Sequence, residues 1–271
     1  MPSHQHANAA YETPAQPATA RRTALVTGAS VGFGLAIATA LCANGWSVIG
    51  AARRLDRLHE LGATLGEGFR PLQLDVTSAA AIEAAFHQVH TWCPQGLDLL
   101  VNNAGLASGK APAQQADMAD WEQMILTNTL GLSRMVHRFL PDMVKRNRGH
   151  IVNIGSVTGN YAYEGSNVYG GTKAFVRQFS MGLRADLHGT QVRVTNIEPG
   201  MVGGTEFSLV RLHGDAAAAA ALYQDVDALQ PEDVAEAVVW AASQPPRVNI
   251  NIIELMPVAQ SLAGTRIHRQ G

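Results

Sequence analysis

The chain has 271 residues, which is enough for one large α/β domain with a substantial core and too few for two ordinary domains with a linker. Apolar residues make up 46% of the sequence, charged residues 15%, and the formal net charge is −2. This balance argues against a disordered chain, a nucleic-acid-binding surface and a polybasic membrane patch. We therefore expect a small soluble metabolite as the partner.

The first 22 residues differ in composition from the rest of the chain. Residues 1–22 are rich in Ala, Pro, Gln and His and contain no continuous apolar stretch, so they resemble neither a signal peptide nor a membrane anchor. They predict a disordered tail before one domain at 23–271. Cys42 and Cys93 lack the spacing of metal ligands. They indicate free thiols in a reducing, cytoplasmic compartment, and we expect no metal site.

A glycine-rich turn follows the first predicted strand. The apolar run at 23–26 leads into Thr-Gly-Ala-Ser-Val-Gly-Phe-Gly, and a helical pattern follows at 35–43. Gly28 permits a tight exit from the strand, Gly32 lets the backbone approach a pyrophosphate, and Gly34 allows close packing of helix on strand. The free N–H groups at a helix start attract anions. The pattern therefore indicates a phosphate site.

The surroundings of the glycine turn strengthen this interpretation. A G-x-x-x-G-x-G triplet is a weak signal alone. Here Asn44-Gly45 marks the end of the helix, and a second predicted strand follows at 47–51. Strand, turn, helix and strand together predict a βαβ unit with a nucleotide-binding turn.

Two arginines follow the second predicted strand. In a dinucleotide fold this position lies beside the adenosine ribose, where an acid accepts hydrogen bonds from a free 2′-hydroxyl and an arginine meets a 2′-phosphate. Arg53 and Arg54 therefore favour NADP over NAD. The alternative is a solvated basic turn that pairs with Asp56 or Glu60.

Polar residues also follow the third and fourth predicted strands, at 69–74 and 97–101. Asp75 can meet an adenine amino group, or it can cap the next helix at 79–92. The sequence Asn102-Asn103-Ala104-Gly105 can brace a neighbouring strand and line a cofactor cleft, or it can be a simple turn.

A long helical pattern covers residues 121–146. Pro141 is expected to bend or interrupt it. Asn128 stands among leucines, so it either braces the backbone as a satisfied polar group or holds a water in a reacting site. The fifth predicted strand, at 150–154, ends at Gly155-Ser156, and open α/β sheets bind ligands at such carboxyl ends.

The next helix is predicted to begin near Asn167, and it carries Tyr169 and Lys173 at a spacing of one turn. This spacing places the phenol and the ammonium on one helix face. A nearby positive charge favours phenolate, so we expect the pKa of Tyr169 to fall toward neutrality. An isolated Y-x-x-x-K is usually a pair of solvent-exposed side chains without a catalytic role. Here it follows Ser156 in a chain that also has a nucleotide-binding turn, and this context favours a catalytic pair.

The sixth predicted strand, at 192–197, leads to a segment with glycine hinges. Pro199-Gly200 and Gly203-Gly204 indicate a lid near 200–225 that closes over nicotinamide and substrate, although a merely flexible connection is the alternative. The alanine run at 216–221 favours helix. Another helix begins at Pro231, and a last strand is expected at 249–255, before a tail at 256–271 that packs on the domain or on a neighbouring subunit.

Taken together, these residues resemble the short-chain dehydrogenase/reductase family. T-G-x-x-x-G-x-G, N-N-A-G, Asn128, Ser156, Tyr169, Lys173 and P-G occur in the family's order, and the resemblance runs from Thr23 to the end. Within the family the chain is similar to the NADP-dependent 3-hydroxy acid dehydrogenases at 168–180, 199–207 and 249–260. The family implies a single-domain Rossmann fold, a doubly wound parallel sheet of about seven strands with helices on both faces.

The resemblance also implies roles for individual residues. Tyr169 is expected to be the general acid and base, Lys173 to lower its pKa and hold the nicotinamide ribose, Ser156 to polarise the substrate oxygen, and Asn128 to hold a water. The implied NADP-binding residues are Gly28, Ser30, Val31, Gly32, Phe33, Gly34, Arg53, Arg54, Asp75, Val76, Asn103, Ala104, Gly105, Tyr169, Lys173, Pro199, Gly200, Val202 and Thr205.

The implied reaction moves hydride between C3 of a small 3-hydroxy acid and nicotinamide. Such a substrate needs a counter-charge for its carboxylate. We expect Arg211 on the lid to supply it, although a solvent-exposed lid charge is an equal alternative. Ser156, Tyr169 and Arg211 are thus the expected substrate residues.

Two other functions remain open from the sequence. The same fold and mechanism could reduce a bulkier ketone or a 3-oxoacyl thioester. A non-catalytic NADP sensor would not need Ser156, Tyr169 and Lys173 together. The family also implies a homotetramer assembled through the helices that contain Asn128 and Tyr169.

Overall fold

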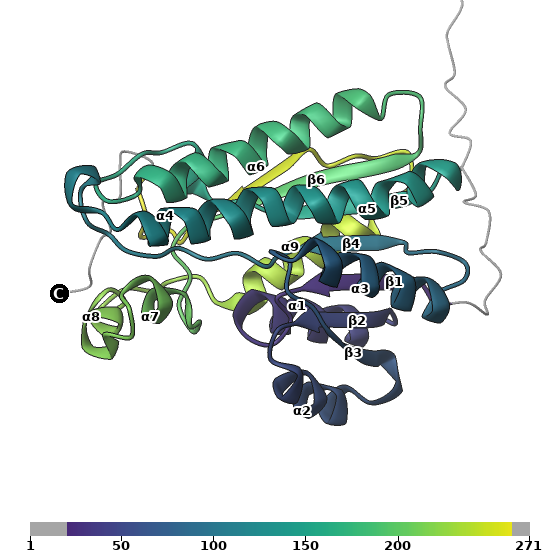
Figure 1. The fold of residues 1–271 in the computed structure, drawn as a ribbon, viewed down its shortest axis with the longest axis horizontal. Helices are drawn as coiled ribbons and strands as arrows, with labels where there is room; N and C mark the ends of the chain where they lie inside the picture. Colours follow the sequence, from purple (N-terminus) through teal and green to yellow (C-terminus); the bar gives the residue numbers. More distant parts are fainter. Residues whose placement is uncertain (1–20, 262–271) are drawn as a thin grey trace, which may run out of the picture.

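The computed structural model describes residues 21–261. Within them, seven strands form one parallel sheet in the order β3-β2-β1-β4-β5-β6-β7 (Figure 1). The strands are β1 (Thr23–Thr27), β2 (Ser47–Ala52), β3 (Phe69–Gln73), β4 (Leu99–Asn102), β5 (Gly149–Ile154), β6 (Val192–Pro199) and β7 (Ile252–Leu255). The predicted doubly wound fold is confirmed. The expected tail at 1–22 lies almost entirely outside the described residues.

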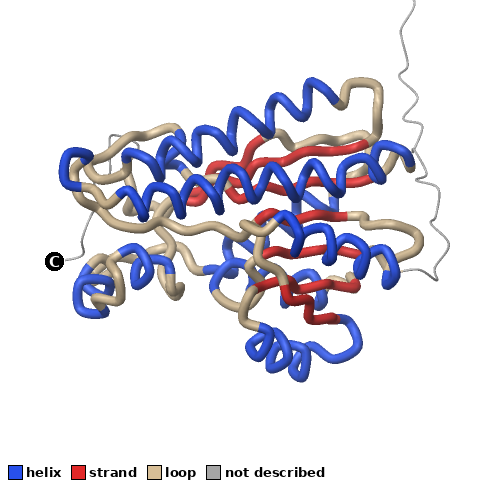
Figure 2. Tube along the Cα trace, viewed as in Figure 1, coloured by secondary structure: helices blue, strands red, loops and turns tan. Residues whose placement is uncertain are grey.

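Helices cover both faces of the sheet (Figure 2). The helices are α1 (Gly32–Ala43), α2 (Leu55–Leu65), α3 (Ala79–Trp92), α4 (Met118–Ile125), α5 (Leu132–Lys145), α6 (Asn167–Asp186), α7 (Phe207–Arg211), α8 (Ala216–Ala221) and α9 (Pro231–Ser243). Apolar residues of α1, α2 and α9 pack on one face, and those of α3, α5 and α6 pack on the other. The central strands are buried on both faces, which explains their continuous apolar runs. None of these helices is long and apolar enough to cross a membrane.

The strand order creates a switch point between β1 and β4. The chain moves outward from β1 through β2 to β3, then returns to the other side of β1 with β4. The loops that follow β1 and β4 therefore diverge and leave a crevice at the carboxyl edge of the sheet. Asn103 bridges this point, since its Nδ2 donates to the carbonyl oxygens of Thr27 and Gly28 at 2.8 and 3.4 Å.

The long helical pattern at 121–146 is not one continuous α-helix. A π-helical turn at Leu126–Gly131 separates α4 from α5. The expected interruption at Pro141 is wrong, because α5 runs through that proline without a break, and the alternative, a bend at Pro141, stays a prediction. The interruption lies instead around Asn128, consistent with the tendency of π-turns to occur at functional sites.

The segment after β6 forms a small excursion that contains α7 and α8, beside the main body in Figure 1. Its two ends meet, because Val202 forms an isolated parallel bridge with Leu229. The amide of Gly203 donates to the carbonyl of Leu229 at 2.8 Å. Gly204 has a φ of +66°, a conformation that favours glycine. We call residues 203–228 the lid segment, and its closing motion stays a prediction.

Candidate active site

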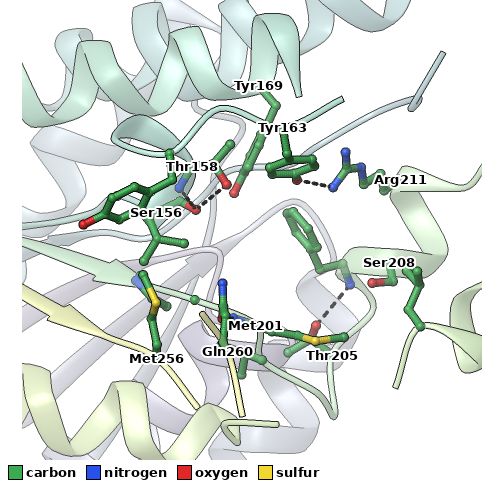
Figure 3. Close-up of a pocket in the computed structure, with 18 of the residues that line it drawn as sticks. Ser156, Thr158, Tyr163, Tyr169, Met201, Thr205, Ser208, Arg211, Met256 and Gln260 are labelled. Carbon is green, nitrogen blue, oxygen red and sulfur yellow. Dashed lines mark hydrogen bonds between the residues drawn. The ribbon is translucent and has the colours of Figure 1, made fainter. Parts of the chain in front are cut away.

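Ser156 and Tyr169 lie at the carboxyl edge of the sheet. Ser156 follows β5 and caps the 3₁₀ turn at Val157–Gly159, since its Oγ accepts a hydrogen bond from the amide of Thr158 at 3.1 Å. Tyr169 lies in the first turn of α6. The two hydroxyl groups come close to each other at one wall of a cavity (Figure 3). The structure therefore brings this predicted pair together.

Tyr169 is buried, and this determines its ionisation. Burial raises the pKa of the phenol above its ordinary value, while a hydrogen bond with Ser156 and the charge of Arg211 act in the opposite direction. The prediction that the pKa of Tyr169 falls toward neutrality is therefore wrong in this structure. The desolvation of the buried phenol outweighs the hydrogen bond with Ser156 and the charge of Arg211. Tyr169 holds its proton at neutral pH.

Lys173 is buried one helical turn beyond Tyr169. Its Nζ donates to the carbonyl oxygen of Ile154 at 2.8 Å and lies 5.8 Å from the centroid of the Tyr169 ring. Burial lowers the pKa of Lys173 to about 8. Gly105 leaves space beside the ammonium group, because a Cβ there would lie 3.6 Å from Nζ and 3.2 Å from Oδ1 of Asn128.

Asn128 is a satisfied polar group in the π-helical turn. Its Nδ2 donates to the carbonyl of Leu106 at 2.8 Å and to Oγ1 of Thr172 at 3.1 Å, and its Oδ1 accepts from the amide of Leu106 at 2.9 Å. The bracing role expected from the sequence is confirmed. The expected role in holding a water stays a prediction.

A cavity of about 480 Å³ runs from the glycine turn to Lys173. Gly28 shapes one end of it: its φ is +69°, and a Cβ there would lie 2.9 Å from Nδ2 of Asn103. Most of the predicted cofactor residues line this cavity, namely Gly28, Ser30, Val31, Gly32, Phe33, Arg53, Arg54, Asp75, Val76, Asn103, Ala104, Gly105, Tyr169, Lys173 and Thr205.

Four predicted cofactor residues do not line this cavity. Gly34 packs behind it, where a Cβ would collide with the carbonyl group of Gly28. Pro199, Gly200 and Val202 line a neighbouring cavity instead. The two cavities meet at Tyr169, which lines both.

Asp75 lies in the wall of the first cavity and does not cap the following helix. Its Oδ1 accepts hydrogen bonds from the amide and hydroxyl of Thr77 at 2.9 and 2.8 Å. Burial alone would raise the pKa of Asp75, but these hydrogen bonds and the charge of Arg53 lower it. The cap of α3 is Ser78, whose Oγ accepts from the amide of Ala81 at 3.2 Å.

The neighbouring cavity holds about 520 Å³, and its wall contains Ser156, Tyr169 and Arg211. Arg211, at the end of α7, donates from Nη1 to the Tyr163 hydroxyl at 2.6 Å and from Nη2 to the Gly165 carbonyl at 3.3 Å (Figure 3). Among the described residues that line this cavity, Arg211 is the only one with a charged side chain. The structure thus brings the predicted arginine and the predicted Ser–Tyr pair to the wall of one cavity.

Several residues of these cavities were not anticipated as site residues. Phe207 packs on Tyr169 with ring centroids 5.6 Å apart, and Tyr163 holds Arg211. Glu206 lines the first cavity and pairs with Arg54. The glycines at 203 and 204 indicated a lid in the sequence. The spacing of residues in a lid, however, does not reveal which of its side chains point into the cavities.

The fold and the Ser–Tyr–Lys arrangement define a class of protein. A family model described as short chain dehydrogenase matches residues 22–215. The chain therefore belongs to the short-chain dehydrogenase family, and it is an oxidoreductase of that family. Within residues 21–261, no group of His, Cys, Asp or Glu is arranged to hold a metal ion.

Particular members of the family are highly similar to this chain. The NADP-dependent 3-hydroxy acid dehydrogenase YdfG of Escherichia coli K12 is 56% identical over 247 residues, which cover 91% of this chain and 99% of that protein. Serine 3-dehydrogenase of Agrobacterium fabrum is 49% identical over 251 residues, 92% of this chain and 98% of that protein.

A solved structure agrees with these relatives. The closed form of serine dehydrogenase complexed with NADP⁺ superposes with a TM-score of 0.87 at 55% identity, and the match covers 92% of this chain and all of that one.

Proposed function

We propose that the protein is an NADP-dependent dehydrogenase of small 3-hydroxy acids, such as L-allo-threonine, serine or 3-hydroxypropionate. One observation carries this proposal: Arg211 lines the same cavity as Ser156 and Tyr169, and this cavity joins the dinucleotide cavity at Tyr169. A guanidinium group pairs well with a carboxylate. A 3-hydroxy acid can therefore place its carboxylate at Arg211 and its C3 hydroxyl at the Ser–Tyr pair. The names of the similar proteins support this substrate class.

NADP is the proposed cofactor, because the first cavity fits it. The glycine turn leaves room for a pyrophosphate, and Arg53 and Arg54 stand where a 2′-phosphate requires positive charge. Lys173 lies at the opposite end, close to Tyr169. When bound, NADP⁺ supplies the acceptor of hydride from C3.

The chain's own residues perform the proton chemistry in this proposal. Ser156 orients and polarises the substrate oxygen, and Tyr169 exchanges a proton with it. Since burial raises the pKa of Tyr169, the phenol carries the proton that the carbonyl oxygen gains in reduction. In oxidation the direction is reversed: the phenol must first lose its own proton to solvent, and the phenolate of Tyr169 then receives the C3 hydroxyl proton as hydride leaves C3. Lys173 provides a buried amine with a pKa near 8 on the same helix face, and Asn128 positions the adjoining backbone.

Nicotinamide absorbance tests the proposal directly. The protein is mixed with L-allo-threonine, L-serine or 3-hydroxypropionate, each with NADP⁺ and separately with NAD⁺. We expect reduction of NADP⁺ with at least one of these acids, and a loss of at least ~10³-fold in Tyr169→Phe, while that variant retains its affinity for NADP⁺. The absence of turnover with all three acids contradicts the substrate class.

A second candidate substrate is a bulkier ketone or a 3-oxoacyl thioester. The cavity of about 520 Å³ has Met201, Met256 and Tyr223 in its wall, and this volume is in the range of sites for drug-sized ligands. Oxidation of NADPH by bulky ketones, without turnover of hydroxy acids, would select this alternative.

We also propose a homotetramer in the cytoplasm. Large apolar side chains are exposed on the π-helical turn and on α6, among them Leu126, Leu130, Phe175 and Met181. Apolar patches of this kind often mark subunit contacts. Light scattering coupled to size-exclusion chromatography tests this assembly, and a monomer at micromolar concentration would contradict it.

A further inference from the structure

A bidentate ion pair joins the lid segment to the end of β2. Arg54 donates from Nη1 to Oε1 of Glu206 at 3.3 Å and from Nη2 to Oε2 at 3.0 Å. Both side chains are about half exposed, 43% for Arg54 and 46% for Glu206. Both also line the proposed dinucleotide cavity. The pair therefore spans the mouth of that cavity.

Arg54 also contacts the glycine turn. Its Nη2 lies 3.4 Å from Oγ of Ser30. This places the guanidinium group between the tip of β2 and the phosphate-binding turn, where the proposed function locates the 2′-phosphate of NADP. The carboxylate of Glu206 thus occupies the edge of the Arg54 guanidinium group at which the 2′-phosphate would bind. Two anions at one guanidinium edge repel each other, so the phosphate and Glu206 compete.

Glu206 is connected to the substrate cavity through α7. It directly precedes this helix, which carries Phe207 against Tyr169 and Arg211 in the substrate cavity. On its other side, Thr205 lies over Gly32, where a Cβ would be 3.3 Å from its Cγ2. If Glu206 is displaced, α7 is therefore expected to move, and Phe207 and Arg211 move with it.

We propose that Glu206 limits the preference for NADP over NAD by competing with the 2′-phosphate for Arg54, and that its displacement repositions α7 over the substrate. The inference rests on the proposed use of NADP. An exposed ion pair changes an equilibrium by no more than about fivefold, so a doubly charged phosphate displaces it readily. NAD, which has a free 2′-hydroxyl, leaves the Arg54–Glu206 pair intact.

Calorimetric titration of the full chain with NADP⁺ and NAD⁺ tests this competition. Glu206→Gln keeps the size of the side chain and removes its charge, so the Kd for NADP⁺ is expected to fall about fivefold. The Kd for NAD⁺ is expected to stay within about twofold of the wild-type value. Glu60→Gln is the matched control, because Glu60 forms an exposed pair with Arg57 at 3.6 Å and does not line the cavity.

The outcomes separate this inference from the proposed function. An unchanged or higher Kd for NADP⁺ in Glu206→Gln, with NADP⁺ still preferred by the wild type, overturns the role of Glu206 alone. A wild type that binds NADP⁺ no more tightly than NAD⁺ overturns the cofactor proposal and this inference with it.

Hydrogen exchange provides a second measurement that does not depend on turnover. Without cofactor, Glu206→Gln is expected to increase exchange about two- to fivefold in the amides of residues 204–212, because the pair no longer holds α7. NADP⁺, and not NAD⁺, is expected to change exchange in the same amides of the wild type. Identical exchange in the free wild type and free Glu206→Gln would contradict the connection between the pair and α7.

Discussion

The ammonium nitrogen of Lys173 lies 5.8 Å from the ring centroid of Tyr169, and both side chains are buried on one face of α6. Burial moves both groups toward their neutral forms, lowering the pKa of Lys173 to about 8 and raising the pKa of Tyr169. The phenol is thus a proton donor at neutral pH, and the amine loses its charge at mildly alkaline pH.

The lowered pKa of Lys173 predicts that stability rises with pH between 8 and 9.5. The unfolded lysine, with a pKa of 10.5, binds a proton in this range, whereas the folded one does not, so the free energy of unfolding increases with pH. Relative to Lys173→Met, the wild type should gain on the order of 1 to 2 kcal/mol. Urea unfolding at both pH values measures this gain, and parallel pH profiles for the two proteins would contradict it.

Replacement of Arg54 should weaken NADP⁺ binding selectively. Arg54→Leu removes a charge-assisted contact to the 2′-phosphate, and the Kd for NADP⁺ should increase about tenfold or more, with little change for NAD⁺. Arg57→Leu is the control, since Arg57 is an exposed arginine on α2 outside the cavity. Equal effects of the two variants would mean that Arg54 belongs only to a solvated basic turn.

Replacement of Arg211 should weaken the binding of hydroxy acids without affecting NADP⁺. Arg211→Met removes the counter-charge for the carboxylate, so the KM for 3-hydroxypropionate should rise at least about tenfold. Tyr163→Phe removes the hydroxyl that holds Arg211 at 2.6 Å and should produce a smaller increase. Steady-state kinetics with each substrate varied in turn measure both effects, and an unaltered KM in Arg211→Met would exclude this carboxylate site.

The buried carboxylate of Glu198 should make Arg177 important for stability. Glu198, in β6, accepts from Arg177 at 2.5 Å, from Asn160 at 2.8 Å and from Asn196 at 2.6 Å. Arg177→Met leaves a fully buried charge with fewer partners. We expect a loss of about 2 kcal/mol, below the value for a completely buried pair because the Arg177 side chain is 36% exposed.

Urea unfolding at pH 7 measures this loss. Arg184→Met serves as the reference for loss of an arginine from α6, because the donors to Glu198 described above are Arg177, Asn160 and Asn196 and do not include Arg184. Equal stabilities of the two variants would show that the pair contributes nothing beyond helix propensity.

Much of the fold could be predicted because its signals are local. The apolar runs of β1, β2 and β5 and the glycine turn between β1 and α1 depend on residues that are adjacent in the chain. An interruption at Pro141 was predicted wrongly, because α5 runs through this proline and the irregularity occurs at Leu126–Gly131. Propensity alone does not distinguish these two sites.

In the candidate site, too, some features follow from residues that are close in the sequence, and others follow only from the packing of distant segments. The sequence by itself determined the parallel α/β fold, the glycine turn and the order in which Ser156, Tyr169 and Lys173 enter the site, since strand ends and helix spacing place these groups. Only the tertiary structure decided the ionisation of Tyr169, the three partners of Asn128 and the pairing of Arg54 with Glu206. Burial and contacts between distant segments depend on how the whole chain packs, and neither property is encoded in the spacing of nearby residues.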